Sequence, residues 1–191
     1  MNYLAHLFLG GDTAESLIGN LAGDFVKGPL RGELSLGIER GIVEHRAIDA
    51  FTDTHAEVNA FRKVLVPEFG HYARVISDVF FDHFLAADFA DISGEPLESF
   101  VDRTCAIIDA YDGVLPGRLA AAYPRMRDEH WLLSYREPAG IFQALYYLSF
   151  RLSRRPHMEL ATRYLIDSRD ELEHHFRRFF PKVREFASRL R

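Results

Sequence analysis

Apolar residues recur at helical spacing through most of this chain. Eight prolines divide it, and between them apolar positions return every three or four residues rather than every second one. Hairpin signals are missing, because the one Asp-Gly pair, Asp112-Gly113, follows a helical pattern and does not join two runs of β-branched residues. The pattern therefore predicts an all-α fold.

The first elements are expected before residue 28. A short apolar segment at 2–9 leads to two glycines. Asp12 follows as a candidate helix cap, with Glu15 three residues later, which is the spacing of a capping box. This arrangement predicts a helix that continues to about residue 27 and is broken by the glycines and proline of residues 28–32.

The longest helical pattern covers residues 35–66. It is long enough for one helix or for two helices that break near His55, and Pro67 is expected to close it. The remaining helices are expected at 72–89, at 96–112, in a short segment opened by Pro116, at 139–152, and at 158–190 with a kink or division at Pro181.

Composition limits the class of protein. With 191 residues, 48% hydrophobic and 27% charged, the chain predicts one globular domain over 1–191. The single cysteine, Cys105, excludes a disulfide scaffold and a CxxC zinc site, and we expect it in the core. No apolar run approaches the ~20 residues of a membrane helix, and the first residues lack the features of a signal peptide. We therefore expect a cytoplasmic protein with no membrane partner.

The net charge of −5 is unevenly distributed. Residues 1–150 carry 12 Lys and Arg against 22 Asp and Glu, whereas residues 151–191 carry 11 against 6. Twenty of the 23 basic residues are arginines, which suit bidentate contact with phosphate or carboxylate groups. The basic end predicts either an acidic partner or an ordinary solvated helix face. Nucleic acid is a disfavoured partner, because the whole chain is acidic and has no basic-aromatic motif or zinc knuckle.

A histidine and a carboxylate interrupt an apolar helix face within residues 35–66. At about 100° per residue, His45 and Asp49 share a face with Ile38, Ile42 and Thr52. A buried carboxylate is costly unless it is paired, and His and Asp four residues apart can hold one cation from both sides. The alternative is a His-Asp hydrogen bond packed beside a neighbouring helix.

The segment 75–85 repeats this feature with two carboxylates. Asp78 and Asp82 lie one helical turn apart on a face that they share with Val75 and Leu85. Like charges so close cannot both stay ionised unaided, so a cation or a shared proton would relieve the repulsion. The alternative is that one of them points to a rim and pairs with an arginine.

A third group of polar residues lies near the start of the chain. His6 belongs to an apolar segment, where a lone histidine is ordinarily a core residue, and Asn20 and Asp24 lie one turn apart between glycines. Oxygen and imidazole ligands without thiolates suit Mn²⁺, Mg²⁺ or Fe²⁺ better than structural zinc. Together the three groups predict a helical hydrolase whose divalent metal polarises a phosphoryl oxygen and activates a water, with arginines stabilising the developing charge.

Several motifs occur in a fixed order along the chain. They are the opening Met-Asn-Tyr-Leu-Ala-His-Leu, Gly19-Asn20, the run from Gly23 to Gly28, Gly41-Ile42, His45-Arg46, Ile48-Asp49, Phe51-Thr52-Asp53, Asp82-His83-Phe84-Leu85 and Ser153-Arg154-Arg155-Pro156. This ensemble resembles the acyl carrier protein phosphodiesterase family. The resemblance implies a single-domain helical bundle related to the HD phosphohydrolase fold and the use of Mn²⁺ or a similar ion.

The resemblance also implies a reaction and a partner. The reaction is hydrolysis of the phosphodiester that joins 4'-phosphopantetheine to a serine of holo acyl carrier protein, which releases the apo protein. Such carrier proteins are small and acidic, so the basic segment 151–191 would attract them electrostatically and raise the association rate.

The resemblance further implies roles for individual residues. The implied metal ligands are Asp24, His45, Asp49 and Asp82. The implied supporting or proton-carrying residues are His6, Asp78 and His83, and the implied substrate or partner contacts are Asn20, Arg46, Arg154 and Arg155. At position 8, where a second histidine is expected, the chain has Phe8, which argues against paired histidine ligands at 6 and 8. The adjacent His-Asp of ordinary HD enzymes is also replaced, by His45-Arg46 with Asp49.

Two other functions remain open from the sequence. One is an HD-like phosphohydrolase that acts on a nucleotide or another small phosphoester, which a substrate panel without carrier protein would reveal. The other is a non-catalytic helical module that binds carrier proteins and uses its buried polar groups only structurally. Apolar stripes on many helices are compatible with a dimer, and the sequence does not identify the oligomeric state.

Overall fold

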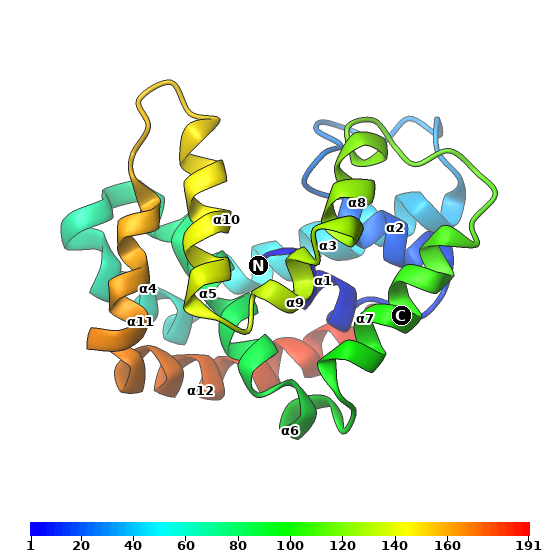
Figure 1. Ribbon diagram of the computed structural model, residues 1–191. Coiled ribbons are helices and arrows are strands. Elements are labelled where there is room, and N and C mark those ends of the chain that lie inside the picture. The colour runs from blue at the N-terminus through cyan, green and yellow to red at the C-terminus, as the bar shows by residue number, and fades with distance from the viewer.

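The computed structural model describes residues 1–191, which form helices and connecting loops without any strand (Figure 1). The α-helices are α1 (Tyr3–Leu9), α2 (Ala14–Ala22), α3 (Leu36–Thr54), α4 (Ala56–Phe69), α5 (Ala73–Ala87), α6 (Phe89–Ser93), α7 (Leu97–Asp109), α8 (Leu119–Asp128), α9 (Trp131–Ser134), α10 (Pro138–Phe150), α11 (Tyr164–Asp167) and α12 (Arg169–Ser188). Two 3₁₀ helices, η1 (Gly70–Tyr72) and η2 (Met158–Arg163), complete the set. The predicted all-α fold is confirmed.

One continuous cluster of 45 buried apolar residues forms the core. Its centre is α5, in which every residue from Val79 to Ala86 is buried. The rings of Phe81 and Phe179 lie 5.4 Å apart, so α5 packs directly on α12. Helix α12 runs across the lower part of the molecule in the view of Figure 1, where only α6 and its neighbouring segments lie lower, and the N-terminus lies above it near α1, α5 and α9. None of the helices combines the length and the apolar character needed to cross a membrane.

Helices α2 and α3 pack closely because two glycines meet between them. A Cβ atom added to Gly19 would lie 2.4 Å from the carbonyl oxygen of Ile38, and one added to Gly41 would lie 2.8 Å from the carbonyl oxygen of Ser16. Any larger side chain at these positions would push the helices apart. This contact brings the C-terminal end of α2 against the middle of α3.

The long pattern at 35–66 forms two helices that break at His55. This residue has φ −75° and ψ 136°, and its Nδ1 atom accepts a hydrogen bond of 3.2 Å from the backbone N–H of Glu57. His55 thus ends α3 and caps α4. Of the two arrangements that the sequence left open, the break near His55 is confirmed.

Three predicted helix boundaries were wrong. The side chain of Thr13, not Asp12, caps α2, because the extended backbone at Thr13 directs its hydroxyl to the N–H of Ser16. Helix α2 also ends at Ala22 rather than near residue 27. Gly23 follows it and, because it has no side chain, lets the backbone pass close to the ring of His45. Pro67 lies inside α4, which ends at Phe69, because Gly70 with φ 54° stops the helix.

The last predicted helix divides at a different place. Between 158 and 190 the chain forms η2, α11 and α12, and the division before α12 lies at Ser168. Helix α12 continues through Pro181 instead of ending there. The short α9 was not predicted at all.

Candidate metal centre

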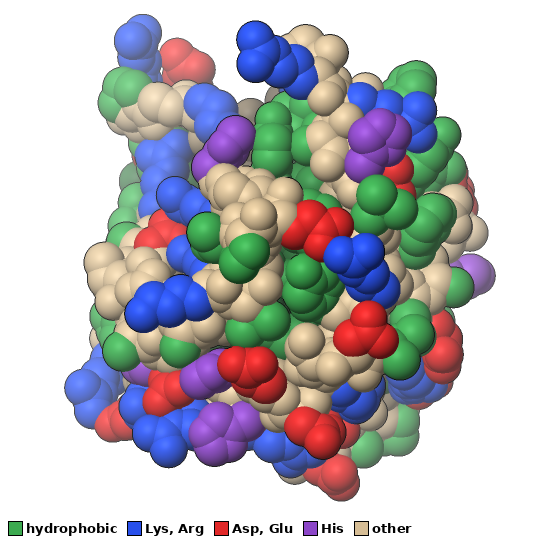
Figure 2. Space-filling model, turned by 90° about the vertical axis from the view of Figure 1, so that its left-hand side faces the viewer, with side chains coloured by type: hydrophobic (Ala, Val, Ile, Leu, Met, Phe, Trp, Pro, Cys, Tyr) green, Lys and Arg blue, Asp and Glu red, His purple; other side chains and the backbone are tan.

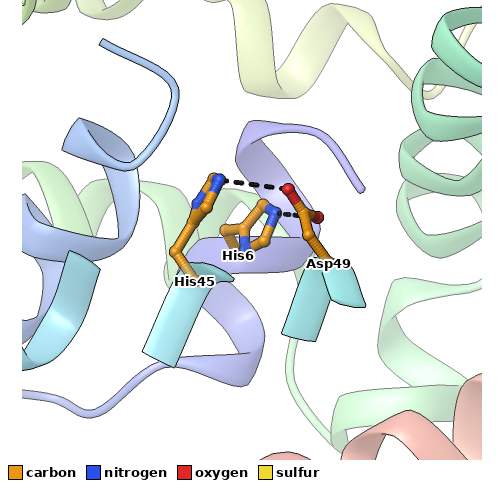
Figure 3. Close-up of side chains that lie close together, drawn as sticks. All are labelled: His6, His45 and Asp49. Atoms are coloured by element: carbon orange, nitrogen blue, oxygen red, sulfur yellow. Dashed lines mark hydrogen bonds and ion pairs between the residues drawn. The ribbon is translucent and has the colours of Figure 1, made fainter. Parts of the chain in front are cut away.

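Three side chains from two helices meet beside the N-terminus (Figure 3). His6 of α1 places its Nε2 atom 3.2 Å from Oδ1 of Asp49, and His45 places its Nε2 atom 3.3 Å from Oδ2 of the same carboxylate. These donor atoms lie within 4.8 Å of one another, which is close enough for one ion to contact all three. Both histidines are buried, whereas the Asp49 side chain is 31% exposed. The cluster is therefore open to solvent on the carboxylate side.

The backbone of α2 fixes the orientation of His45. Its Nδ1 atom lies 2.8 Å from the carbonyl oxygen of Asn20, which can only accept a hydrogen bond. Nδ1 must therefore carry the proton in the neutral ring, and Nε2 is left with a lone pair that faces Asp49. Two acceptors that face each other at this distance require a proton or a cation between them. The residues thus fit a divalent cation, and the fit rests on this contact.

The two imidazole rings lie against each other in the cluster. They stack with their centroids 3.6 Å apart, and burial together with the neighbouring His45 lowers the pKa of His6 to about 3. Nδ1 of His6 is buried and has no hydrogen-bond partner. Burial acts to raise the pKa of Asp49, but a proton held between this carboxylate and His45, together with the hydrogen bond from His6, outweighs it and holds this pKa below its ordinary range. A neutral His6 beside an ionised Asp49 is the pair of protonation states that metal binding requires of these two residues.

The amino group of Met1 lies at the edge of the cluster. It donates a hydrogen bond of 2.9 Å to Oδ1 of Asp49 and lies 3.4 Å from Oδ1 of Asp78. Burial acts to lower the pKa of this amino group, but the two carboxylates outweigh it and raise the pKa to about 10. Asp78 also lies 3.4 Å from the guanidinium of Arg62. Of the two interpretations of the Asp78 and Asp82 pair, the structure favours pairing of one member with an arginine.

Asp82 is a residue of α5 that lies outside the cluster and faces the first turn of α1. Its two oxygens accept hydrogen bonds of 2.8 and 3.1 Å from the backbone N–H groups of Leu4 and Ala5, and its side chain is fully buried. Asp82 thus satisfies two of the unpaired N–H groups that every helix has in its first turn. Burial outweighs these bonds and raises its pKa to about 7. The structure does not bring Asp82 into the cluster, because both of its oxygens already bind backbone donors.

His83 also points away from the cluster. Its Nδ1 atom lies 2.9 Å from the carbonyl oxygen of Tyr135, next to α9, and burial lowers its pKa. Its Nε2 atom is buried without a partner. In the structure His83 therefore supports the position of Tyr135 and touches none of the three clustered side chains.

An open pocket of about 450 Å³ lies over the cluster. Asp24 lines it, with Oδ1 3.8 Å from Nε2 of His45 and 42% of its side chain exposed. Arg46 lines it as well and donates a hydrogen bond of 2.9 Å to the carbonyl oxygen of Val26, which holds the loop after α2 in place. The side chain of Asn20 is instead fully buried and donates to Ser16 and Glu44. The structure thus brings Asp24 and Arg46 to the cluster, and of Asn20 only the backbone.

The basic end of the chain separates into two kinds of arginine. In α12, Arg177 pairs with Asp88 and Arg178 pairs with Glu57, both at 2.6 Å, so these charges are largely neutralised. The loop after α10 differs, because its arginines, Arg151, Arg154 and Arg155, form no ion pair and stay exposed. The guanidinium of Arg155 lies over the ring of Tyr146 at 4.9 Å. Lys and Arg side chains stand along the upper edge of the face in Figure 2, beside exposed hydrophobic side chains.

The structure places His6 in the cluster itself, next to His45 and Asp49, where the family resemblance implies a supporting residue. Residues 3–9 form a helix, and positions two apart on a helix point in different directions. Phe8 accordingly packs against Phe89 and Phe180 in the core, while His6 faces Asp49. Phe8 thus lies on another face of α1 and does not take part in the contact between His6 and Asp49. Helical periodicity over residues 3–9 is the signal that separates these two faces.

These observations define the class as a helical protein with an imidazole and carboxylate cluster suited to a divalent cation. The model of the acyl carrier protein phosphodiesterase family matches residues 1–183. The chain belongs to this family.

Proteins named acyl carrier protein phosphodiesterase are similar over nearly the whole chain. One from Klebsiella pneumoniae subsp. pneumoniae is 36% identical over 98% of this chain and 97% of its own length. One from Pectobacterium atrosepticum is 32% identical over 100% and 95%, and one from Escherichia coli O45:K1 is 34% identical over 99% and 98%. No solved structure matches the chain, so the relation to the HD phosphohydrolase fold stays a prediction.

Proposed function

We propose that this protein hydrolyses the phosphodiester between 4'-phosphopantetheine and the serine of holo acyl carrier protein, releasing the apo carrier. The observation that carries the proposal is the facing contact of His45 Nε2 and Asp49 Oδ2 at 3.3 Å beneath an open pocket. In a chain of this family, that contact supports a cation site to which a phosphodiester has access from solvent.

The proposed cation ligands are His6, His45 and Asp49, with Asp24 at the rim. Mn²⁺ is the proposed ion, with Mg²⁺ and Fe²⁺ as alternatives, because the ligands are imidazole and carboxylate without thiolate. When bound, such an ion stabilises charge on a phosphoryl oxygen and lowers the pKa of water. The chain's own contribution is to hold the His6 imidazole neutral and to present Arg46 at the pocket wall, where a phosphate would meet its positive charge.

The proposed partner is an acidic carrier protein met in the cytoplasm. The exposed arginines of the loop after α10 support this partner, because no carboxylate of the chain neutralises them. Rim charges of this kind act mainly on the association rate and are screened by salt. The rate of association with holo carrier protein should therefore fall as the salt concentration rises.

The deciding experiment incubates the purified protein with Mn²⁺ and holo acyl carrier protein and follows the mass of the carrier. We expect the carrier to lose the mass of 4'-phosphopantetheine, and Asp49→Ala and Asp24→Ala to abolish this loss. Asp102→Ala is the matched control, because Asp102 is an exposed carboxylate of α7 without an ion-pair partner. Full activity in both pocket variants would show that the site is assigned wrongly.

Two further measurements separate the alternative functions. A panel of nucleotides and small phosphoesters without carrier protein detects the small-molecule phosphohydrolase. Thermal unfolding with Mn²⁺ and then with a chelator detects the non-catalytic module, for which chelation changes nothing. For a true metal site, Mn²⁺ at 100 times its Kd should stabilise the fold by about 2.7 kcal/mol, and the chelator should reverse this gain.

A further inference from the structure

A second cavity, separate from the open pocket, lies between α1, α9 and α10. Its volume is about 120 Å³, and Asn2, Tyr3, Trp131, Gln143, Tyr147 and Arg151 are among the side chains that line it. Its lining combines aromatic rings and amide groups with two charged side chains, Arg151 and Glu129. Arg151 forms no ion pair, whereas Glu129 accepts hydrogen bonds from Trp131 and Arg125. Nothing in the chemistry of the metal centre uses this cavity.

The cavity begins next to the metal centre. The amino group of Met1 contacts Asp49, and the next two residues, Asn2 and Tyr3, line the cavity. Successive Cα atoms are about 3.8 Å apart, so the cavity starts within two residues of the clustered carboxylate. On the other side, the ring of Tyr3 stacks on Phe25 at 6.1 Å, and Phe25 directly follows Asp24. The cluster and the cavity are thus close together in the fold, on two sides of the first residues of the chain.

The walls of the cavity are held in place by specific contacts. Buried Tyr135 accepts a hydrogen bond of 3.3 Å from the side chain of Asn2, and its carbonyl oxygen contacts His83 at 2.9 Å. Gly140 allows the start of α10 to approach α9, because a Cβ atom there would lie 2.0 Å from the carbonyl oxygen of Ser134. The cavity is thus part of the folded structure and does not need a ligand to form it.

We infer that this cavity binds the pantetheine arm of the substrate while the phosphate lies at the His6, His45 and Asp49 cluster. The inference rests on the proposed function. A pantetheine arm is an uncharged chain with two amides, a hydroxyl group and a dimethyl-substituted carbon. Gln143 and the tyrosine hydroxyl groups match its amides, and the aromatic faces match its apolar carbons. Binding energy from this non-reacting part of the substrate can be used to orient the phosphodiester.

Tryptophan fluorescence can be used to measure binding of pantetheine in the cavity. Trp131 is its single tryptophan and lines the cavity, so its fluorescence reports on the occupant. We expect free pantetheine, which lacks the phosphate, to change Trp131 fluorescence saturably in the purified protein. Tyr147→Ala and Gln143→Ala should weaken the apparent affinity roughly three- to tenfold, as expected for the loss of one aromatic or polar contact.

Tyr146→Ala is the matched control. Tyr146 is the neighbour of Tyr147 on α10, stacks on Phe142 and Phe150 and does not line the cavity. It should bind pantetheine like the unaltered protein. With holo carrier protein as substrate, Tyr147→Ala should lower kcat/KM by a similar factor while the Mn²⁺ affinity stays unchanged.

The two proposals fail in different ways. Equal pantetheine affinity in Tyr147→Ala and Tyr146→Ala, or no saturable signal at all, overturns the cavity assignment even if the carrier is hydrolysed. Saturable binding that Tyr147→Ala weakens supports the cavity assignment. If holo carrier protein then stays intact, the proposed reaction is wrong and the cavity assignment still holds.

Discussion

Helices α3 and α5 both carry an imidazole and a carboxylate among apolar residues, and the structure treats the two pairs in opposite ways. On α5, Asp82 binds two backbone N–H groups and His83 binds a backbone carbonyl. On α3, His45 and Asp49 turn their acceptor atoms toward each other. The first pair is used to hold helices together, whereas the second leaves a place for a cation.

The difference lies in what each pair meets in the fold, not in its residue types. Asp82 faces the first turn of α1, where N–H groups have no intrahelical partner, and this surrounding satisfies a carboxylate completely. Asp49 faces two imidazoles and an amino group at a solvent-exposed edge. A buried polar residue is thus a ligand candidate when its acceptors lack donors from the backbone.

The matched variants His45→Ala and His83→Ala test most directly whether α3, and not α5, binds the cation. Loss of His45 removes a proposed direct ligand, so the Mn²⁺ affinity should fall by at least about 100-fold, which is the upper range for loss of groups that only support a ligand. His83→Ala should leave the Mn²⁺ affinity unchanged and lower the stability instead. Titration calorimetry with Mn²⁺ measures the affinity of both variants, and thermal unfolding measures their stability. Equal losses of Mn²⁺ affinity would mean that α5 also contributes to the metal site.

Asp82→Ala should have the largest effect on stability. It leaves the buried N–H groups of Leu4 and Ala5 without acceptors, which costs about 2–4 kcal/mol in the free energy of unfolding. Urea unfolding measures this, with Asp102→Ala as the exposed control. If Asp82→Ala instead keeps full stability but loses Mn²⁺ binding, Asp82 is a metal ligand as the family resemblance implies.

Gly23→Ala tests whether the orientation of His45 matters. The backbone φ of Gly23, −53°, suits alanine. The added Cβ atom, however, would lie 2.2 Å from Cγ of His45 and would displace the His45 ring from the Asn20 carbonyl. We expect the Mn²⁺ affinity to fall roughly tenfold, as for loss of a supporting contact. Gly94→Ala is the control, because it strains a positive φ at the end of α6 without touching the cluster. Equal affinities in both variants would show that the tautomer of His45 is not important.

The ion pairs between α4 and α12 should show the smallest effect. Hydrogen bonds from His175 and Arg178 lower the pKa of Glu57 to about 2, so its contribution to stability is complete above the ordinary value near 4.5 and is lost as the pH falls toward 2. Glu57→Gln should therefore be slightly less stable than the unaltered protein at pH 6, and this difference should be smaller at pH 3, where only part of the contribution of Glu57 remains. Urea unfolding at the two pH values decides this, and a constant difference would place the effect outside Glu57 ionisation.

Local pattern was sufficient for most helices and for one half of the metal centre. The spacing of His45 and Asp49 on an apolar face needed only helical geometry, and both residues lie in the cluster. The boundaries at Thr13 and Pro67 depended on local backbone angles that the side-chain pattern does not report.

The rest of the centre depended on contacts between distant segments. His6 lies 43 residues before Asp49, and nothing in its own surroundings along the chain distinguishes a ligand from a core histidine. The role of Asp82 likewise depended on where α1 docks, 78 residues before it. Such contacts follow from the packing of whole helices and are not encoded in the spacing of neighbouring residues.

The two hydrogen bonds between Asp82 and the first turn of α1 also bear on when the cluster of His6, His45 and Asp49 can form during synthesis. Helix α1 has seven residues, which is too short to persist alone in water, so its helical form depends on its contacts with the rest of the fold. During synthesis, His6 leaves the ribosome long before Asp82 exists, and it cannot take its place in the cluster until α5 has followed. The cluster of His6, His45 and Asp49 can therefore form only after α5 has joined the fold, so a metal ion bound there would be acquired by the folded core.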